Sequence, residues 1–129
     1  MKSQDNRPLS PHLQIYRLPF AAILSITHRA TGVILSLAAL SMIWVLTAAA
    51  SGAESYLAIH VHFASWYGQI FLIGVTLSLY IHLCNGIRHL FWDAGLGFEL
   101  ETAAISAKAA IAAAVVLTSA TWLIALNVG

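Results

Sequence analysis

Three long stretches of this chain contain no charged side chain, and they constrain its fold more than any other feature. They are residues 30–50, 63–87 and 109–128. Crossing the hydrocarbon core of a bilayer takes about 20 residues of helix. Only 9% of the 129 residues are charged, against about 25% in soluble domains. The sequence therefore predicts an all-α integral membrane protein with three transmembrane helices.

Basic residues are unevenly distributed among the segments that flank these spans. Four of the six Lys and Arg residues precede the first span, none lies in the first loop, and Arg88 and Lys108 lie in the second. Positive residues concentrate on the cytoplasmic side of a membrane. We therefore expect the N-terminus on the cytoplasmic or matrix side and the C-terminus on the opposite side. The net charge of +1 argues against a nucleic-acid partner.

Residues 1–29 are unlike the remainder of the chain. They contain all three prolines of the sequence, and proline interrupts helices. We expect residues 1–29 to form an irregular N-terminal arm with an interfacial segment. Residues 30–129 would then form the three-span anchor.

Polar side chains concentrate where the predicted spans meet the cytoplasm or matrix. Ser25, His28 and Arg29 are three and four residues apart, so they would share a face if that stretch is helical. A second polar group lies at the end of the second span and consists of His82, Asn85, Arg88, His89 and Asp93. Antiparallel packing of the first two spans would bring the two groups together.

His82 is the most deeply placed of these residues. It lies six residues before Arg88, which puts it roughly 9 Å inside the charged boundary at 1.5 Å per residue. An ionisable group at that depth is costly and is by default a candidate functional residue. One interpretation is a neutral imidazole that is hydrogen-bonded to a carbonyl or hydroxyl group. The other is an axial ligand to haem iron or another metal.

A haem at this position would make further demands on the chain. Gly86, four residues after His82, would leave space for a planar group. The propionates would need partners near the membrane surface, and the residues available for this are His28, Arg29, Arg88 and His89. Because only one histidine is buried, a six-coordinate haem would take its second ligand from another chain. Small residues on the spans also favour close helix packing and indicate a partner subunit.

Ser25 and Arg29 allow two interpretations. They could hydrogen-bond a quinone carbonyl while the quinone tail stays in the lipid. Alternatively, Arg29 extends to lipid phosphates and Ser25 bonds to its own helix, and the residues alone favour this second interpretation. For Asp93 they also favour a structural role, either an ion pair with Arg88 or the cap of a following helix.

Two motifs give the chain a family resemblance. "SITHRATG" (residues 25–32) and "HLCNGIRHLFWDAG" (residues 82–95) resemble the cytochrome b membrane-anchor subunit of succinate dehydrogenase, respiratory complex II. "RPLSPHLQIY" (residues 7–16) is similar to the start of the same subunit in alphaproteobacteria and mitochondria. The motifs at residues 25–32 and 82–95 are specific for the family when they occur together. The resemblance covers nearly the whole chain.

The resemblance implies an architecture and a set of site residues. The chain would be half of a two-subunit anchor bundle, and with a second small membrane-anchor subunit it would hold one haem b and a ubiquinone site. His82 matches the family's axial haem ligand. Ser25 and Arg29 match residues at the quinone headgroup. His28 matches a residue near a haem propionate, and Asp93 matches one near the quinone pocket.

The resemblance also implies partners and a location. An iron–sulfur subunit and an FAD flavoprotein subunit would dock on the inner face, and succinate oxidation would belong to them. The chain alone would not be an enzyme, but a subunit of succinate dehydrogenase (quinone) in the bacterial inner (cytoplasmic) membrane rather than the mitochondrial one. The alternative is a non-redox helical membrane anchor or assembly protein without haem. A small transporter is a third option, but nothing in the sequence indicates broken helices or paired half-spans.

Overall fold

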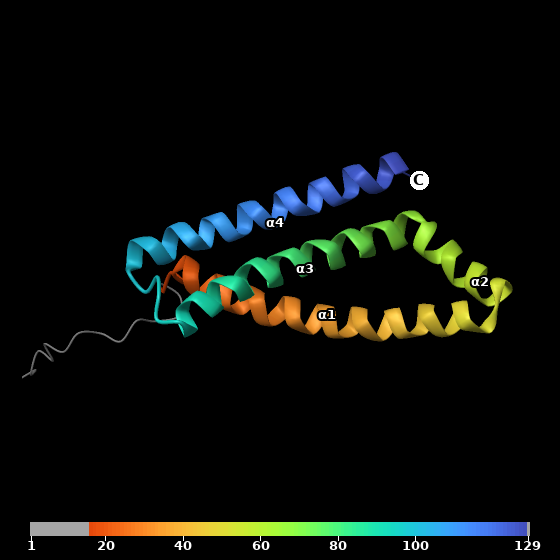
Figure 1. Cartoon of the computed structure of the whole chain (residues 1–129), viewed down its shortest axis with the longest axis horizontal. Coiled ribbons are helices and arrows are strands. Elements are labelled where there is room, and N and C mark those ends of the chain that lie inside the picture. The colour runs from red at the N-terminus through yellow and green to blue at the C-terminus, as the bar shows by residue number, and fades with distance from the viewer. Residues whose placement is uncertain (1–15, 129) are drawn as a thin grey trace, which may run out of the picture.

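The computed structural model describes residues 16–128, which contain four α-helices (Figure 1). Their bounds are α1 Phe20–Ser51, α2 Ala53–Ala64, α3 Trp66–Asp93 and α4 Leu100–Val128. Three of them, α1, α3 and α4, are long and apolar enough to cross a membrane, so the prediction of an all-α membrane protein with three spans is confirmed. Residues 1–15, with most of the motif at residues 7–16, lie outside the described part.

The long helices extend beyond the charge-free stretches at one end of the bundle. α1 begins at Phe20, directly after Pro19, whose backbone is extended, so the arm expected to be irregular up to residue 29 is helical in its last ten residues. The reason is that an absence of charge marks the depth of the hydrocarbon core, and a helix can continue into the interface. We call this end, where Arg29, Arg88 and Lys108 lie, the basic end.

The opposite end is closed by α2, a helix that the charge pattern did not predict. Gly52 separates it from α1 with a φ of 121°, a conformation that favours glycine. Ser65 ends α2 and begins α3, and its hydroxyl oxygen accepts a hydrogen bond from the Gly68 amide. A side chain at Gly68 would overlap the His62 carbonyl oxygen and Phe63, so glycine permits the sharp turn from α2 into α3.

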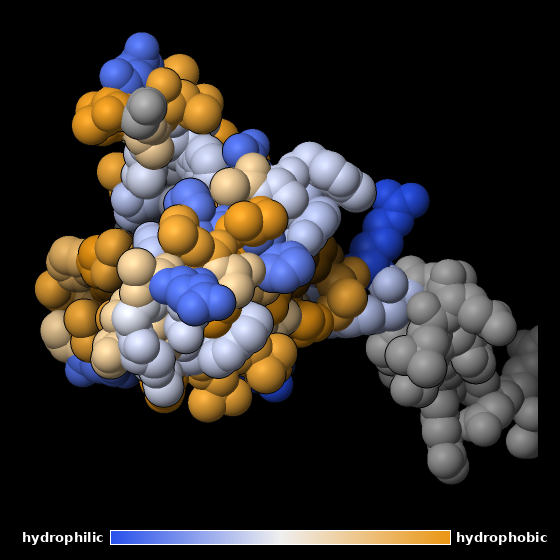
Figure 2. Space-filling model, turned by 90° about the vertical axis from the view of Figure 1, so that its right-hand side faces the viewer, coloured by the Kyte–Doolittle hydropathy of each residue, from blue (hydrophilic) through white to orange (hydrophobic). Residues whose placement is uncertain are grey.

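Small and polar side chains form the contacts between the long helices, and α3 packs against both α1 and α4 (Figure 1). The buried residues of these three helices include Thr31, Ala48, Ser78, Asn85, Ala107, Ala114 and Thr118. Large apolar side chains such as Leu40 and Ile43 are exposed instead. In the view onto the end with α2 and the C-terminus, hydrophobic residues cover much of the flanks (Figure 2). This distribution suits a bundle whose solvent is lipid, where small residues let helices approach closely.

Candidate functional site

Three imidazole rings from α1 and α3 meet at the basic end. The rings of His28 on α1 and His82 on α3 stack with centroids 3.9 Å apart and planes inclined by 10°. The His89 ring lies 5.2 Å from that of His28 and is tilted by 42°. We call these three residues the histidine cluster. The two polar groups that were expected to meet therefore do so through their histidines.

The hydrogen bonds of His82 fix which of its ring nitrogens carries the proton. Nδ1 lies 3.1 Å from the backbone carbonyl oxygen of His28, and because a carbonyl oxygen only accepts, Nδ1 must donate. In a neutral imidazole this leaves the lone pair on Nε2. Within residues 16–128, no hydrogen bond reaches His82 Nε2, and it is not among the fully buried unpaired side-chain atoms, which are His28 Nδ1 and Trp122 Nε1, so it is at least partly accessible. His82 thus presents an unprotonated nitrogen to groups outside the chain.

This geometry combines the two interpretations of His82. Its Nδ1 makes the bond to a carbonyl that a purely structural histidine would make. Its Nε2 stays free to act as a ligand. The two roles are compatible, since histidines that bind metals usually donate their other N–H to a carbonyl or carboxylate.

Two glycines border the histidine cluster. A Cβ added at Gly32 would lie 3.3 Å from Cε1 of His82, so the missing side chain lets that ring lie against α1. A Cβ at Gly86 would lie 3.8 Å from Cε1 of His28, which is an ordinary contact. The space at Gly86, expected beside a planar group at His82, therefore adjoins the His28 ring.

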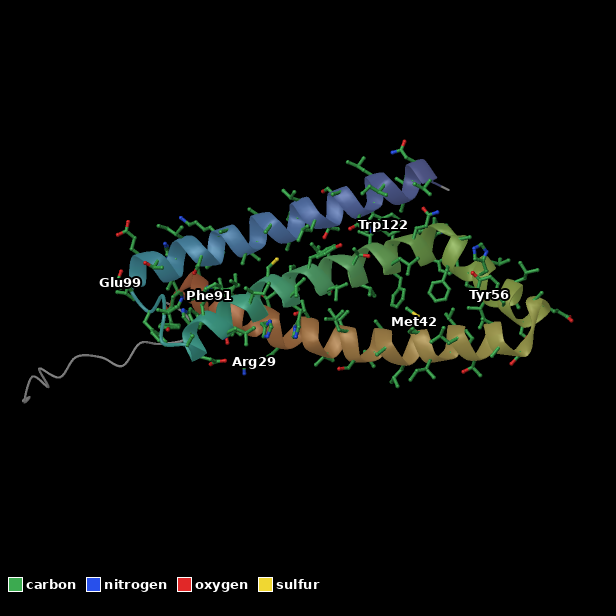
Figure 3. All side chains as sticks on the ribbon, in the orientation of Figure 1. Arg29, Met42, Tyr56, Phe91, Glu99 and Trp122 are labelled. Carbon is green, nitrogen blue, oxygen red and sulfur yellow. The ribbon has the colours of Figure 1, made fainter. Side chains whose placement is uncertain are left out.

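Ser25 and Arg29 are both exposed residues of α1, and Figure 3 shows Arg29 at the outside of the bundle. The Nε of Arg29 is 3.5 Å from the Ser25 backbone carbonyl oxygen, which confirms that the two residues are one helical turn apart on adjoining positions. Within residues 16–128, the Ser25 hydroxyl makes no hydrogen bond, so the expected bond to its own helix is not formed. The Ser25 hydroxyl and the Arg29 guanidinium face outward, whereas the His28 ring faces α3.

Arg88 was expected beside His28 and Arg29 as a partner for propionates, and the structure corrects this. The residue is 6% exposed, and its guanidinium donates to Ser106 Oγ at 3.0 Å and to the Ala103 carbonyl oxygen at 3.1 Å, both on α4. Six residues turn a helix by about 600°, so Arg88 points about 120° away from the His82 side of α3. It is therefore directed toward α4 and away from the histidine cluster.

The Arg88 guanidinium is linked to α1 through Asn85, its neighbour on α3. It donates to Asn85 Oδ1 at 3.1 Å and lies 4.1 Å from the centre of the Trp92 ring. Asn85 is 2% exposed, and its amide is 3.5 Å from the Leu24 carbonyl oxygen on α1. All of these hydrogen-bond acceptors are neutral. The network holds the three long helices together at the basic end.

Asp93 is the last residue of α3 and is exposed. Neither structural role expected for it is present: within residues 16–128 no ion pair joins it to Arg88, and it lies seven residues before the first residue of α4, too far to cap that helix. The helical period explains the first result, because five residues place Asp93 about 140° around α3 from Arg88. The same period places Asp93 about 20° from the direction of His82. Asp93 therefore points to the same side of α3 as the histidine cluster.

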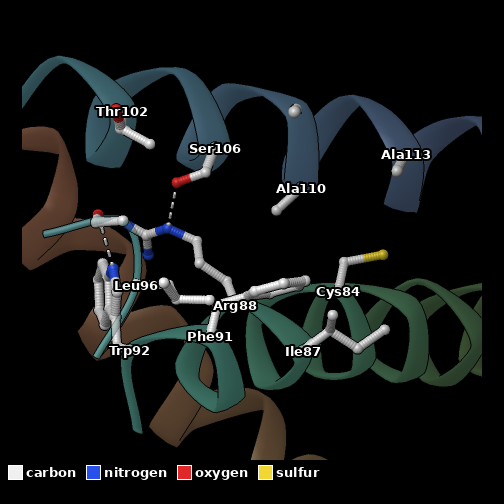
Figure 4. A pocket seen from close by; sticks show the side chains of 12 residues that line it. Cys84, Ile87, Arg88, Phe91, Trp92, Leu96, Thr102, Ser106, Ala110 and Ala113 are labelled. Atoms are coloured by element: carbon white, nitrogen blue, oxygen red, sulfur yellow. Dashed lines mark hydrogen bonds between the residues drawn. The ribbon is translucent and has the colours of Figure 1, made fainter. Parts of the chain in front are cut away.

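A cavity of about 550 Å³ lies between α3 and α4 at the basic end (Figure 4). Cys84, Arg88 and Trp92 line it from α3, and small residues such as Ser106 and Ala110 line it from α4. Neither the histidine cluster nor Ser25, Arg29 or Asp93 lines this cavity. The histidine cluster and the cavity are therefore separate features of the basic end.

Sequence reasoning did not single out Thr31, although it lies within the motif at residues 25–32. Thr31 is 4% exposed, and its Oγ1 lies 3.1 Å from Nδ1 of His82. The available signal was its position three residues after His28. A threonine inside a helix usually bonds to its own backbone, so the motif alone could not indicate a contact with a second helix.

Comparison with known proteins gives matches along nearly the whole chain. Residues 3–121 match the family described as succinate dehydrogenase/fumarate reductase transmembrane subunit. The succinate dehydrogenase cytochrome b556 subunit of Paracoccus denitrificans is 45% identical over 95% of this chain and 94% of its own length. The corresponding subunit of Rickettsia felis is 39% identical over 92% of each chain. The succinate dehydrogenase cytochrome b560 subunit of Reclinomonas americana is 34% identical, over 92% of this chain and 86% of its own.

Proposed function

This chain belongs to the succinate dehydrogenase/fumarate reductase transmembrane subunit family, as a cytochrome b556 membrane subunit of succinate dehydrogenase, and on that premise we propose roles for its basic end. His82 is the axial ligand of a haem b. Ser25 and Arg29 form part of the site at which ubiquinone is reduced. His28 lies near a haem propionate, and Asp93 lies near the quinone pocket.

The histidine cluster fits a haem b. The observation that carries the proposal is the 3.1 Å contact between His82 Nδ1 and the His28 carbonyl oxygen on α1. Because the carbonyl can only accept, Nδ1 is the donor, and Nε2 is left as the ligand atom that haem iron takes from imidazole. His28 gives further support, because its Nδ1 is buried without a partner. An orphaned buried N–H is rarer than an unpaired buried acceptor, so we assign the His28 proton to Nε2, where it can be donated to a propionate. When bound, haem b would supply a one-electron redox centre.

The second axial ligand is proposed to come from a second small membrane-anchor subunit. The His28 and His82 rings are stacked nearly parallel with centroids 3.9 Å apart, which leaves no room for a metal ion between them. They cannot both bind the same iron in this arrangement. Within residues 16–128, no three His, Cys, Asp or Glu side chains form a metal-binding group. The haem would therefore lie between this chain and its partner anchor.

Arg29 and Ser25 are proposed to bind the ubiquinone headgroup at the exposed face of α1. The hydrogen bond of Arg29 uses only Nε, so its two terminal nitrogens are available to donate to a quinone carbonyl, as is the Ser25 hydroxyl. The positive charge of Arg29 next to the carbonyl oxygen would stabilise the negative charge that develops on this oxygen during reduction. Reduction of ubiquinone to ubiquinol takes two electrons and two protons. In this proposal the iron–sulfur subunit delivers the electrons one at a time, and the protons come from the aqueous phase at the basic end.

We further propose that the basic end faces the cytoplasm of a bacterium, across its inner membrane. Four of the six Lys and Arg residues precede the first span, which supports this orientation. The iron–sulfur subunit, and with it the FAD flavoprotein subunit, would dock there, close to Ser25 and Arg29. Succinate oxidation would take place in those subunits.

A visible spectrum of the purified complex tests this proposal against a non-redox membrane anchor. We expect a reduced-minus-oxidised spectrum of a low-spin b-type haem, in a complex that reduces a ubiquinone analogue with succinate. A complex that contains this chain but shows no haem absorption would support the anchor without haem and would overturn the role proposed for His82.

A further inference from the structure

The Thr31 hydroxyl lies at the contact between α1 and α3, where it meets two groups. Its Oγ1 is 2.8 Å from the His28 carbonyl oxygen and 3.1 Å from Nδ1 of His82. The hydroxyl has one proton to donate, and the carbonyl oxygen can only accept, so this proton goes to the carbonyl. Thr31 Oγ1 therefore accepts a hydrogen bond from Nδ1–H of His82.

The Nδ1–H group of His82 thus has two acceptors on α1. Thr31 Oγ1 and the His28 carbonyl oxygen each lie 3.1 Å from Nδ1. Two acceptors on a second helix restrict rotation of the ring about its bond to Cβ more than one acceptor would. The remaining freedom is reduced by the stacked His28 ring and by the backbone at Gly32, where even a Cβ would lie 3.3 Å from the His82 ring.

We infer that Thr31 is a positioning residue for His82: its hydroxyl holds the imidazole in one plane, so that α1 sets the orientation of a ligand carried by α3. The inference rests on the proposed function, since His82 must be the haem ligand. It goes further in naming the group that orients the ligand. Groups that hydrogen-bond the second nitrogen of a metal-binding histidine commonly fix the orientation and basicity of the ring.

Two matched substitutions separate the hydroxyl from the shape of the side chain. Thr31→Val keeps the branched shape and removes the hydroxyl, whereas Thr31→Ser keeps the hydroxyl and removes the methyl group. Both are made in the complete complex, and the oxidised complex is studied by electron paramagnetic resonance. The g values of a low-spin ferric haem depend on the planes of its axial imidazoles. The midpoint potential of the haem is measured in the same samples.

We expect Thr31→Val to retain haem but to shift or broaden the signal at the highest g value and to change the midpoint potential. Thr31→Ser should keep the wild-type signal and potential. A wild-type signal in Thr31→Val would overturn the inference, and so would an equal shift in both variants, because that would assign the effect to packing. If Thr31→Val does not assemble, Thr31→Ala removes the hydroxyl without adding bulk and is judged in the same way.

The failure of the proposed function has a different signature. A low-spin haem that persists in His82→Ala would remove His82 as the ligand whatever the Thr31 variants show. A haem that is lost in His82→Ala and unchanged in Thr31→Val would preserve the function and remove only the role of Thr31.

Discussion

His28 contacts His82 through two different groups. Its ring stacks on the His82 ring at 3.9 Å, and its backbone carbonyl oxygen accepts a hydrogen bond from Nδ1 of His82 at 3.1 Å. A substitution at His28 removes the ring and leaves the carbonyl in place. The two contacts can therefore be separated experimentally.

We predict that His28→Ala retains a low-spin haem, because the hydrogen bond that leaves Nε2 of His82 free is still formed. Haem affinity should nevertheless fall by roughly 10-fold, the lower end of what substitutions next to metal ligands cost. Titration of the haem-depleted complex with haem measures this. A loss of haem as complete as that caused by removing His82 would show that the His28 ring is itself a ligand.

Arg29→Ala is predicted to reduce the rate of ubiquinone reduction by roughly 100-fold, the cost of removing one donor to a developing negative charge. Succinate oxidation with an artificial electron acceptor should continue, because that chemistry is proposed to take place in other subunits. Lys108→Ala is the matched control, since Lys108 is an exposed cation on α4 outside the proposed site. Unchanged ubiquinone turnover in Arg29→Ala would exclude Arg29 from the quinone site.

Arg88→Met is predicted to destabilise the bundle without altering the haem spectrum. The side chain makes two hydrogen bonds to α4, and at about 0.6 kcal/mol for each interhelical bond in a membrane the loss is roughly 1 kcal/mol. The unfolding midpoint of the complex in detergent measures it, with Lys108→Met as a control for the loss of charge. A shifted haem spectrum at unchanged stability would contradict this prediction and would indicate that Arg88 lies near the haem propionates.

The orientation of the bundle can be tested with single cysteines. Cys84 is the one native cysteine, so a Cys84→Ser background allows exposed positions at the two ends to be labelled separately. We predict that Glu99→Cys reacts with a membrane-impermeant maleimide only from the cytoplasmic side, and Glu54→Cys only from the opposite side. The reverse pattern would place Ser25 and Arg29 on the side away from the proposed electron source.

The sequence predicted the parts of the fold that depend on local chemistry. A charge-free stretch must cross the bilayer as a helix whatever its neighbours are, so the three spans could be predicted. The helical period then placed Ser25 and Arg29 one turn apart. It could also have shown that Arg88 and His82 point in different directions. The extent of α1 before residue 30 was missed because charge marks the membrane boundary and not the helix end.

The remaining features depend on how the helices pack. Arg88 finds its acceptors on α4, and the spacing of residues within α3 contains no information on the position of α4. Thr31 and His82 are 51 residues apart, and their contact requires the close approach that Gly32 permits. The α2 helix has no charge signature and is set apart from its neighbours by the backbone at Gly52 and Ser65.

The assignment of His82 as the axial haem ligand is tested most directly by optical spectroscopy of the assembled complex carrying His82→Ala. His60→Ala, an exposed histidine at the α2 end, provides the matched control. We predict that the low-spin haem signal is lost in His82→Ala and retained in His60→Ala, with both complexes still assembled. An intact low-spin signal in His82→Ala would contradict the assignment.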